Sequence, residues 1–223
     1  ITFVVAKSIY DRIHSYTDKV ELITNGINTD FYSNPNIVKN DVLKKIEGKK
    51  IIGYLGTVRN WMDFDLLEAI LRKFPNAVLM FVGYVDRNGV DDFERLKKYK
   101  NLLHIDFIPQ EETPSYLAAF DVGLIPFKVN DFTVSVFPYK FYEYIAASIP
   151  IVTTALPELY QFKEYILYSE TNEMFLENTK SILEGKFKLD KVNYSKIAYD
   201  NSWDKKVGIL EKRIMAFLPR QSV

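Results

Sequence analysis

Two ionisable side chains of opposite charge stand three residues apart in the mainly apolar segment FPYKFYEYIAASIPIVTT, residues 137–154. If this segment begins as a helix, Lys140 and Glu143 lie on one face of its first turns. A cation near a helix N-terminus attracts an anionic group such as a phosphate. A carboxylate one turn further along can accept hydrogen bonds from two vicinal hydroxyls, as a ribose offers. The alternative is a solvated ion pair worth about 0.2–0.5 kcal/mol, and residue chemistry alone leaves both interpretations open.

Further candidates lie in segments that would follow buried strands. Gly56 has no side chain, so a ligand could approach the backbone closely there. Arg59 in the same loop either clamps an anion or faces solvent. The aromatic residues are interpreted as core side chains, and only Trp61, in a loop, is a candidate for stacking on a ligand. His104 alternates within a strand pattern and is interpreted as a hydrogen-bonded sheet histidine. The glycine spacing does not match G-x-G-x-x-G, and no G-K-[ST] P-loop occurs. Nicotinamide, flavin and P-loop nucleotide sites therefore lose support.

Composition narrows the class of protein. Of 223 residues, 48% are hydrophobic and 26% charged, and the formal net charge is +0, which is typical of a soluble globular protein without a nucleic-acid partner. The chain has no cysteine and only two histidines, so we expect no metal site built from thiolates or imidazoles. No run of about 18 apolar residues exists, so we expect no transmembrane segment. The lack of cysteine suits a reducing compartment, and we expect a cytoplasmic protein.

Short apolar runs alternate with segments of helical period, which predicts parallel βαβ units. The predicted strands are 51–55, 77–82, 102–108, 121–127, 149–154 and, more weakly, 165–169. Two helices are predicted from their N-caps: one after Asp63 and one after Thr113, with Pro114 in its first turn. Three more are predicted over residues 138–148, starting at Pro138, over 172–184 and over about 204–217. The predicted fold class is α/β, a Rossmann-like doubly wound parallel sheet.

The ends of the chain have a different organisation. Residues 1–32 predict the last β-α-β unit of another sheet, with a helix from about Ser8 to Tyr16, so the chain is expected to be cut from a longer protein. Residues 33–50 predict a polar linker and a short helix, 51–190 the complete doubly wound domain, and 191–223 C-terminal helices.

Several segments occur in the order found in a known family. NGINTDFY, IIGYLGTVRNWMDFDLL, VLMFVGYVD, YLAAFDVGLIPF, PYKFYEYIAASIPIV and NSWDKKV resemble the carboxyl half of a GT-B fold glycosyltransferase of group 1, also called family 4. The resemblance implies two Rossmann-like domains facing a cleft, with the nucleotide sugar on the carboxyl domain and the acceptor on the amino-terminal one. Residues 1–32 would then be the remnant of that acceptor domain, and the last helix would cross back to it.

The resemblance also implies roles for single residues. Glu143 would hold the ribose hydroxyls of the donor, Lys140 would lie near the diphosphate, and Arg59 is a weaker match to a phosphate-binding arginine. The backbone of Ile108 and Pro109 would contact the base. The remaining expected donor contacts are Gly56, Thr57, Tyr139 and Ser135, where Ser135 stands at a position that carries a second glutamate in many members.

The implied function is transfer of a sugar from a nucleoside diphosphate to an acceptor hydroxyl in glycan or polysaccharide synthesis, without cofactor or metal. The acceptor, a glycan or lipid-linked sugar, would be bound by the missing half, through which the protein could also attach to the inner face of the membrane. Two alternatives stay open: a nucleotide-sugar epimerase on the same fold, and a nucleotide-binding subunit that needs a separate acceptor-binding chain. Retention or inversion of the sugar configuration is equally open.

Overall fold

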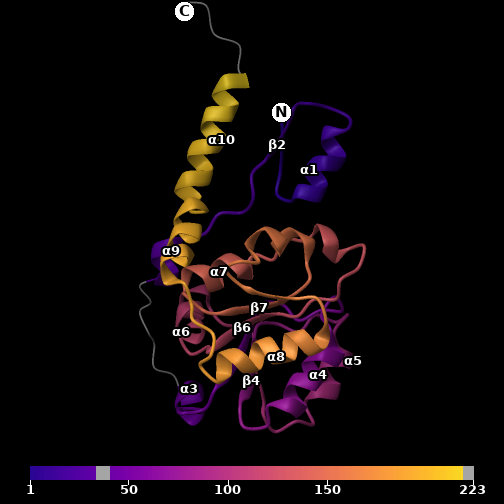
Figure 1. Cartoon of the computed structure of the whole chain (residues 1–223), viewed down its shortest axis with the longest axis vertical. Coiled ribbons are helices and arrows are strands. Elements are labelled where there is room, and N and C mark those ends of the chain that lie inside the picture. Colours follow the sequence, from indigo (N-terminus) through magenta and orange to yellow (C-terminus); the bar gives the residue numbers. More distant parts are fainter. Residues whose placement is uncertain (34–40, 218–223) are drawn as a thin grey trace, which may run out of the picture.

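A six-stranded, fully parallel sheet forms the body of the protein in a computed structural model that describes residues 1–33 and 41–217. Its strand order is β5-β4-β3-β6-β7-β8 (Figure 1). The strands are β3 (Ile51–Leu55), β4 (Val78–Val82), β5 (Leu102–Ile105), β6 (Val122–Ile125), β7 (Ile151–Thr154) and β8 (Leu167–Ser169). This order confirms the predicted doubly wound sheet, with β3 and β6 adjacent at its centre.

The central strands are apolar throughout because helices cover the sheet. Every residue of β3, β4, β6 and β7 is buried, as expected for a parallel sheet with two covered faces. Helix α4 (Phe64–Lys73) contacts both α5 (Val90–Leu96) and α8 (Asn172–Leu183), and α8 contacts β6, β7 and β8. Helix α7 (Lys140–Ala146) packs against β6 and against α9 (Lys191–Asp200). The sheet therefore holds the start of α7 at the carboxyl ends of the strands.

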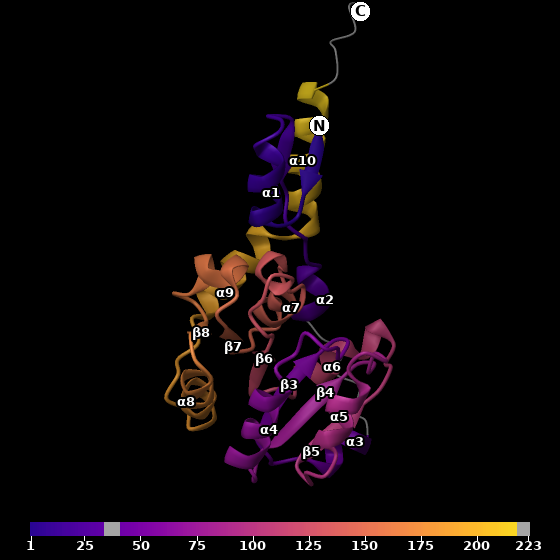
Figure 2. The ribbon, with the colours of Figure 1, turned by 90° about the vertical axis from the view of Figure 1, so that its right-hand side faces the viewer.

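Residues 2–22 form a separate small unit. Strands β1 (Thr2–Val4) and β2 (Val20–Leu22) pair in parallel, with α1 (Lys7–His14) between them. The unit lies beside the long helix α10 (Trp203–Phe217), away from the large sheet (Figures 1 and 2). This arrangement confirms the predicted β-α-β unit at the amino end.

Glu158 joins this unit to the body of the protein. The residue lies in the 3-10 helix η3 (Pro157–Phe162), and its buried carboxylate accepts hydrogen bonds from the backbone N–H groups of Lys7 and Ser8, both at 3.1 Å. The hydroxyl of Ser8 donates to the same carboxylate at 3.1 Å. A side chain of the large domain thus caps the first turn of α1.

Two predicted helix starts are wrong by a few residues. Thr113 is the first residue of α6 (Thr113–Leu117) rather than its N-cap, because the 3-10 helix η1 (Gln110–Glu112) runs directly into it. Helix α7 begins at Lys140, two residues after Pro138. Pro138 instead starts a turn, in which the N–H of Phe141 donates to the carbonyl of Pro138 at 3.0 Å. The predicted strand 102–108 is also too long, since β5 ends at Ile105.

The linker that joins β2 to β3 comprises residues 23–50, a longer segment than the predicted 33–50, and it is described in part. Helices α2 (Thr29–Ser33) and α3 (Asp41–Lys45) flank residues 34–40, which lie outside the described residues. Helix α3 confirms the short helix expected before β3.

Candidate functional site

Two glycine turns form the floor of the site at the carboxyl ends of β3 and β4. Gly56 has φ +123° and Gly83 has φ +140°, backbone conformations that L side chains rarely adopt. A Cβ atom on Gly83 would lie 2.5 Å from the carbonyl oxygen of Gly56, so the two turns pack backbone to backbone. The N–H of Gly56 donates to the carbonyl of Val82 at 2.8 Å, which fixes the pair. Bare backbone is therefore exposed where a ligand could approach.

Lys140 extends over this floor. Its Nζ atom lies 4.7 Å from the ring centre of Tyr54 and 4.6 Å from that of Phe127, so the ammonium is held by cation–π contacts. Burial lowers the pKa of Lys140 to about 8, while the negative charge of Glu143 acts in the opposite direction. Lys140 forms no hydrogen bond or ion pair with any residue in the described ranges 1–33 and 41–217. A half-buried cation of this kind is available for an anionic ligand.

Glu143 lies on the same helix but does not form an ion pair with Lys140 in the part of the chain that the structure describes. Its Oε1 atom instead accepts a hydrogen bond of 2.7 Å from the hydroxyl of Tyr32, in α2. Burial raises the pKa of Glu143, and the hydrogen bond from Tyr32 and the charge of Lys140 partly offset that rise. The solvated Lys–Glu pair considered from the sequence is therefore wrong, because each side chain is half-buried with a different neighbour.

Tyr32 is the residue of this site that sequence reasoning missed. It is buried at 4% exposure and contacts α7 from the linker, 111 positions before Glu143. The sequence does contain a signal for it, because Tyr32 is the last residue of NGINTDFY, one of the segments that carry the family resemblance.

Arg59 has partners of its own. Its Nε atom lies 3.4 Å from Oδ1 of Asp86, and its guanidinium lies 4.6 Å from the ring centre of Trp61. Trp61 also stacks on Phe132, with ring centres 5.6 Å apart and planes at 22°. The aromatic surface that suggested ligand stacking is thus in contact with protein side chains. Contact between Arg59 and a phosphate stays a prediction.

The other expected donor contacts are placed around the same edge of the sheet. Thr57 is exposed, and its carbonyl accepts a hydrogen bond of 2.9 Å from the hydroxyl of Tyr54. Ser135 is half-buried at the end of the 3-10 helix η2 (Thr133–Ser135), which contacts α1. Tyr139 precedes α7, is 38% exposed, and has a side-chain hydrogen bond with Trp203.

Ile108 and Pro109 lie further away along the sheet. They follow β5, the edge strand, which is separated from β3 by β4. The carbonyl of Pro109 accepts a hydrogen bond of 3.0 Å from the N–H of Glu112. His104, in β5, bonds the carbonyl of Gly83 through Nε2 at 3.0 Å, which confirms its interpretation as a satisfied sheet histidine.

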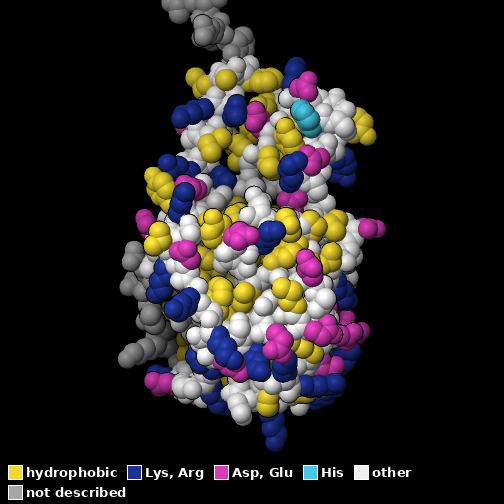
Figure 3. Space-filling model, viewed as in Figure 1, with side chains coloured by type: hydrophobic (Ala, Val, Ile, Leu, Met, Phe, Trp, Pro, Cys, Tyr) yellow, Lys and Arg dark blue, Asp and Glu magenta, His cyan; other side chains and the backbone are white. Residues whose placement is uncertain are grey.

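Two pockets adjoin Lys140 and Arg59. The first, of about 190 Å³, is mainly apolar and is lined by Trp61, Phe127, Phe132, Thr133, Val136, Phe137, Pro138, Tyr139 and Lys140. The second, of about 430 Å³, shares Trp61 and Phe132 and is more polar; its other lining residues are Arg59, Asn60, Asn88 and Asn130. In Figure 3 hydrophobic side chains gather over the middle of the face shown, whereas charged side chains dominate its lower end. The pocket edges thus combine aromatic rings with side-chain amides.

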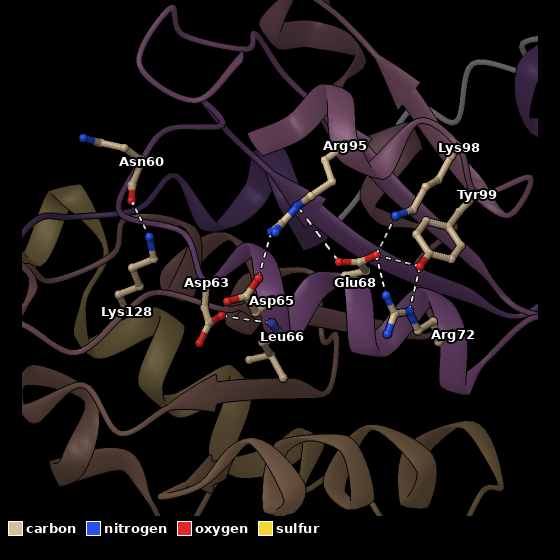
Figure 4. A network of polar contacts seen from close by, with 10 residues as sticks. All are labelled: Asn60, Asp63, Asp65, Leu66, Glu68, Arg72, Arg95, Lys98, Tyr99 and Lys128. Carbon is tan, nitrogen blue, oxygen red and sulfur yellow. Dashed lines mark hydrogen bonds and ion pairs between the residues drawn. The ribbon is translucent and has the colours of Figure 1, made fainter. Parts of the chain in front are cut away.

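Polar contacts join α4 to α5 and to the residues that follow α5, and a separate contact joins the loops of Asn60 and Lys128 (Figure 4). Asp63 caps α4 by accepting from the N–H of Leu66 at 2.9 Å, and Lys128 donates to the carbonyl of Asn60 at 3.3 Å. On α4, Glu68 accepts hydrogen bonds from Lys98, Tyr99 and Arg72, which lower its pKa to about 2. These contacts stabilise the scaffold rather than the ligand site.

Comparison with known proteins assigns the family. The family model for glycosyl transferases of group 1 matches residues 49–184, more than half of the chain. The chain belongs to this family. TuaH of Bacillus subtilis strain 168, named as a glycosyltransferase of teichuronic acid biosynthesis, is 28% identical over 164 residues, which are 73% of this chain and 41% of TuaH.

Solved structures of glycosyltransferases share the fold of this group 1 chain. HepE of Anabaena, solved in complex with UDP and glucose, matches with a TM-score of 0.74 and 12% identity over 97% of this chain and 62% of HepE. The lipopolysaccharide outer core galactosyltransferase WaaB matches with a TM-score of 0.69 and 10% identity over 97% of this chain and 62% of WaaB. The GT-B fold predicted from the sequence is confirmed. The chain spans less than two thirds of the length of each of these relatives.

Membrane-spanning helices and metal-ligating clusters are both absent from the described residues. None of the helices in residues 1–33 and 41–217 is long and apolar enough to cross a membrane. The same described segments contain no group of three or more His, Asp or Glu side chains that could hold a metal ion.

Proposed function

We propose that this chain is the donor-binding half of a glycosyltransferase that moves a sugar from a nucleoside diphosphate to an acceptor hydroxyl. The observation that carries the proposal is the position of Lys140, a half-buried cation without a carboxylate partner among the described residues, over the half-buried turn at Gly56. Glu143 lies one turn further along the same helix, where it would accept hydrogen bonds from a ribose. Membership of the group 1 family supports this assignment.

The chemical demand of sugar transfer fits these side chains. As the bond to the sugar breaks, negative charge develops on the departing diphosphate. A cation and backbone N–H groups already held in place stabilise that charge without reorganisation. Lys140 would supply the cation, and the turn that follows Gly56 would supply the backbone, since the N–H of Gly56 itself donates to the carbonyl of Val82. We propose that no metal ion is needed for this step, and that Thr57, Ser135 and Tyr139 line the diphosphate and sugar.

The acceptor side is proposed from the length of the relatives. The chain spans 62% of HepE and 41% of TuaH, so the acceptor would be bound by a domain to which residues 1–32 belong and to which the last helix crosses back. We propose an acceptor that is a glycan or lipid-linked sugar, in polysaccharide synthesis, as the name of TuaH suggests. We also propose a cytoplasmic protein that meets lipid-linked acceptors at the inner face of the membrane. This chain alone should bind a donor without transferring its sugar.

Calorimetry with UDP, GDP and ADP and their sugars tests the donor site. UDP is the first choice because HepE was solved with it. We expect binding of at least one nucleoside diphosphate, and a loss of about 1–3 kcal/mol in Glu143→Ala, which leaves the ribose hydroxyls without their acceptor. Lys180→Ala, which removes an exposed cation of α8 that lies 3.8 Å from Glu184, is the matched control and should bind normally. Absence of binding at millimolar concentration would contradict the proposal.

A further inference from the structure

The linker between the two units contributes a side chain to the site. The hydroxyl of Tyr32 donates to Oε1 of Glu143 at 2.7 Å, and the tyrosine is 4% exposed. A buried hydroxyl without a partner costs free energy, so this contact is strongly favoured once Tyr32 is in place. In the described part of the chain, no other side chain hydrogen-bonds the carboxylate, which leaves Oε2 for a ligand.

Local sequence fixes where Tyr32 lies. A Cβ atom on Gly26 would be 2.6 Å from the indole of Trp203, so only glycine allows the chain to pass so close to the start of α10. Ile27, fully buried, then pairs with Ser202 in an isolated parallel bridge. Asn28 accepts from the N–H of Phe31 at 3.2 Å and starts α2, which packs against α7. The linker is therefore held at three successive residues before it delivers Tyr32.

We propose that Tyr32 is a positioning residue of the donor site, which fixes one oxygen of Glu143 so that the other receives a ribose hydroxyl. This inference rests on the proposed function, in which Glu143 binds the ribose. It extends the site beyond residues 51–190, because the donor carboxylate is oriented from the linker.

The charges around Glu143 predict how this role shows itself. Burial raises the pKa of Glu143, and the hydrogen bond from Tyr32 and the charge of Lys140 both oppose that rise. Tyr139 and Tyr144 also face the carboxylate, and burial raises the pKa of each, so both stay neutral at neutral pH. Removing the Tyr32 hydroxyl should therefore raise the pKa of Glu143 further. A protonated carboxyl accepts fewer hydrogen bonds than a carboxylate. As the pH falls, the variant without the Tyr32 hydroxyl should therefore lose ribose binding at a higher pH than the unaltered chain does.

Tyr32→Phe in the full 223-residue chain tests the proposal, because it keeps the ring and removes only the hydroxyl. The probe is whichever of UDP, GDP and ADP binds the unaltered chain most tightly, titrated from acidic to neutral pH. We expect the Kd at neutral pH to rise about five- to tenfold. We expect the pH at which binding is half lost to rise by about one unit.

Tyr142→Phe is the matched control. Its hydroxyl is also partly buried and bonds Thr24 and Asn201, both at 3.1 Å, at the position next to Glu143 in the chain. This variant should lose a comparable amount of thermal stability and keep both the Kd and the pH midpoint. A double-mutant cycle adds the second control: in a Glu143→Ala background, where the tyrosine hydroxyl has no carboxylate to position, Tyr32→Phe should change the Kd less than about twofold.

The outcomes separate the two proposals. If no nucleoside diphosphate binds the unaltered chain, the proposed function fails and this inference fails with it. If nucleotides bind and Tyr32→Phe matches the unaltered chain in Kd and pH midpoint, only the role of Tyr32 is overturned. A loss of affinity that is equal at every pH and persists in the Glu143→Ala background would show a structural contribution instead, which also overturns it.

Discussion

A methyl group added to Gly56 would lie 3.5 Å from Cε and 3.7 Å from Nζ of Lys140. The glycine turn after β3 and the lysine of α7 thus share one small volume, although they are far apart in the sequence. Any anion that approaches the turn at Gly56 must meet the ammonium of Lys140. This relationship is the structural basis for placing a diphosphate there.

Gly56→Ala should weaken nucleotide binding and destabilise the fold. The positive φ of +123° costs an alanine about 1–3 kcal/mol, and the methyl group narrows the space in front of Lys140. Thermal unfolding and calorimetry measure the two effects. Gly185→Ala, at φ +70° with open space around its Cβ, is the control for strain alone and should leave nucleotide affinity intact. Equal nucleotide affinity in both variants would contradict the role of Gly56.

Lys140 should take up a proton when a nucleoside diphosphate binds. Burial lowers its pKa to about 8, so part of the population is neutral near pH 8 in the free chain, and an adjacent anion restores the charge. Calorimetry in buffers of different ionisation enthalpy should show uptake of up to about half a proton at pH 8. Lys140→Met should bind more weakly and show no uptake. Binding without uptake in the unaltered chain would place the anion elsewhere.

The same shift predicts a pH effect on stability. The folded-state pKa of Lys140, about 8, is below the ordinary value of 10.5, so the unfolded chain binds more protons between these values. The free energy of unfolding should therefore gain a contribution from Lys140 as the pH rises from about 8 to about 10.5. Denaturant titrations at several pH values should show that the free energy of unfolding changes with pH differently in the unaltered chain and in Lys140→Met. Parallel curves would argue against a desolvated lysine.

Glu158→Ala should loosen the β1-α1-β2 unit from the large domain. The carboxylate accepts from the N–H groups of Lys7 and Ser8, and losing such a cap costs about 0.5–2 kcal/mol. Hydrogen exchange should accelerate in α1 and remain unchanged in β3 and β4. Asp190→Ala, which removes the cap of α9 at Asn193, is the comparison and should leave α1 protected. Unchanged exchange in α1 would mean that Glu158 does not anchor it.

Asp86→Asn tests whether Arg59 reaches the ligand. The substitution removes the negative charge 3.4 Å from the Nε of Arg59 and keeps the oxygen that accepts from the N–H of Asn88. If Arg59 then turns to a phosphate, nucleotide affinity should increase about two- to fivefold, the range expected for an exposed ion pair. Asp91→Asn makes the same change of net charge on the exposed start of α5. An affinity that does not exceed that of Asp91→Asn would remove Arg59 from the site.

The sequence predicted what depends on local pattern. Apolar runs located all six strands of the sheet, and the spacing of Lys140 and Glu143 placed them on one helix face. The partners of these side chains could not be predicted, because they come from distant segments. Tyr32 reaches Glu143 across 111 positions, and Asp86 competes for Arg59 from the next βα loop. Helix starts at Thr113 and Pro138 were misplaced because a 3-10 turn and a tight turn precede α6 and α7.

A crystal structure of the chain with the nucleoside diphosphate that it binds most tightly tests the central claim most directly. We expect a diphosphate oxygen within hydrogen-bond distance of the Nζ of Lys140 and above the backbone of Gly56. We also expect a ribose hydroxyl on Oε2 of Glu143, with the Tyr32 contact retained. A nucleotide bound with its diphosphate away from Lys140, or a ribose that does not touch Glu143, would contradict it.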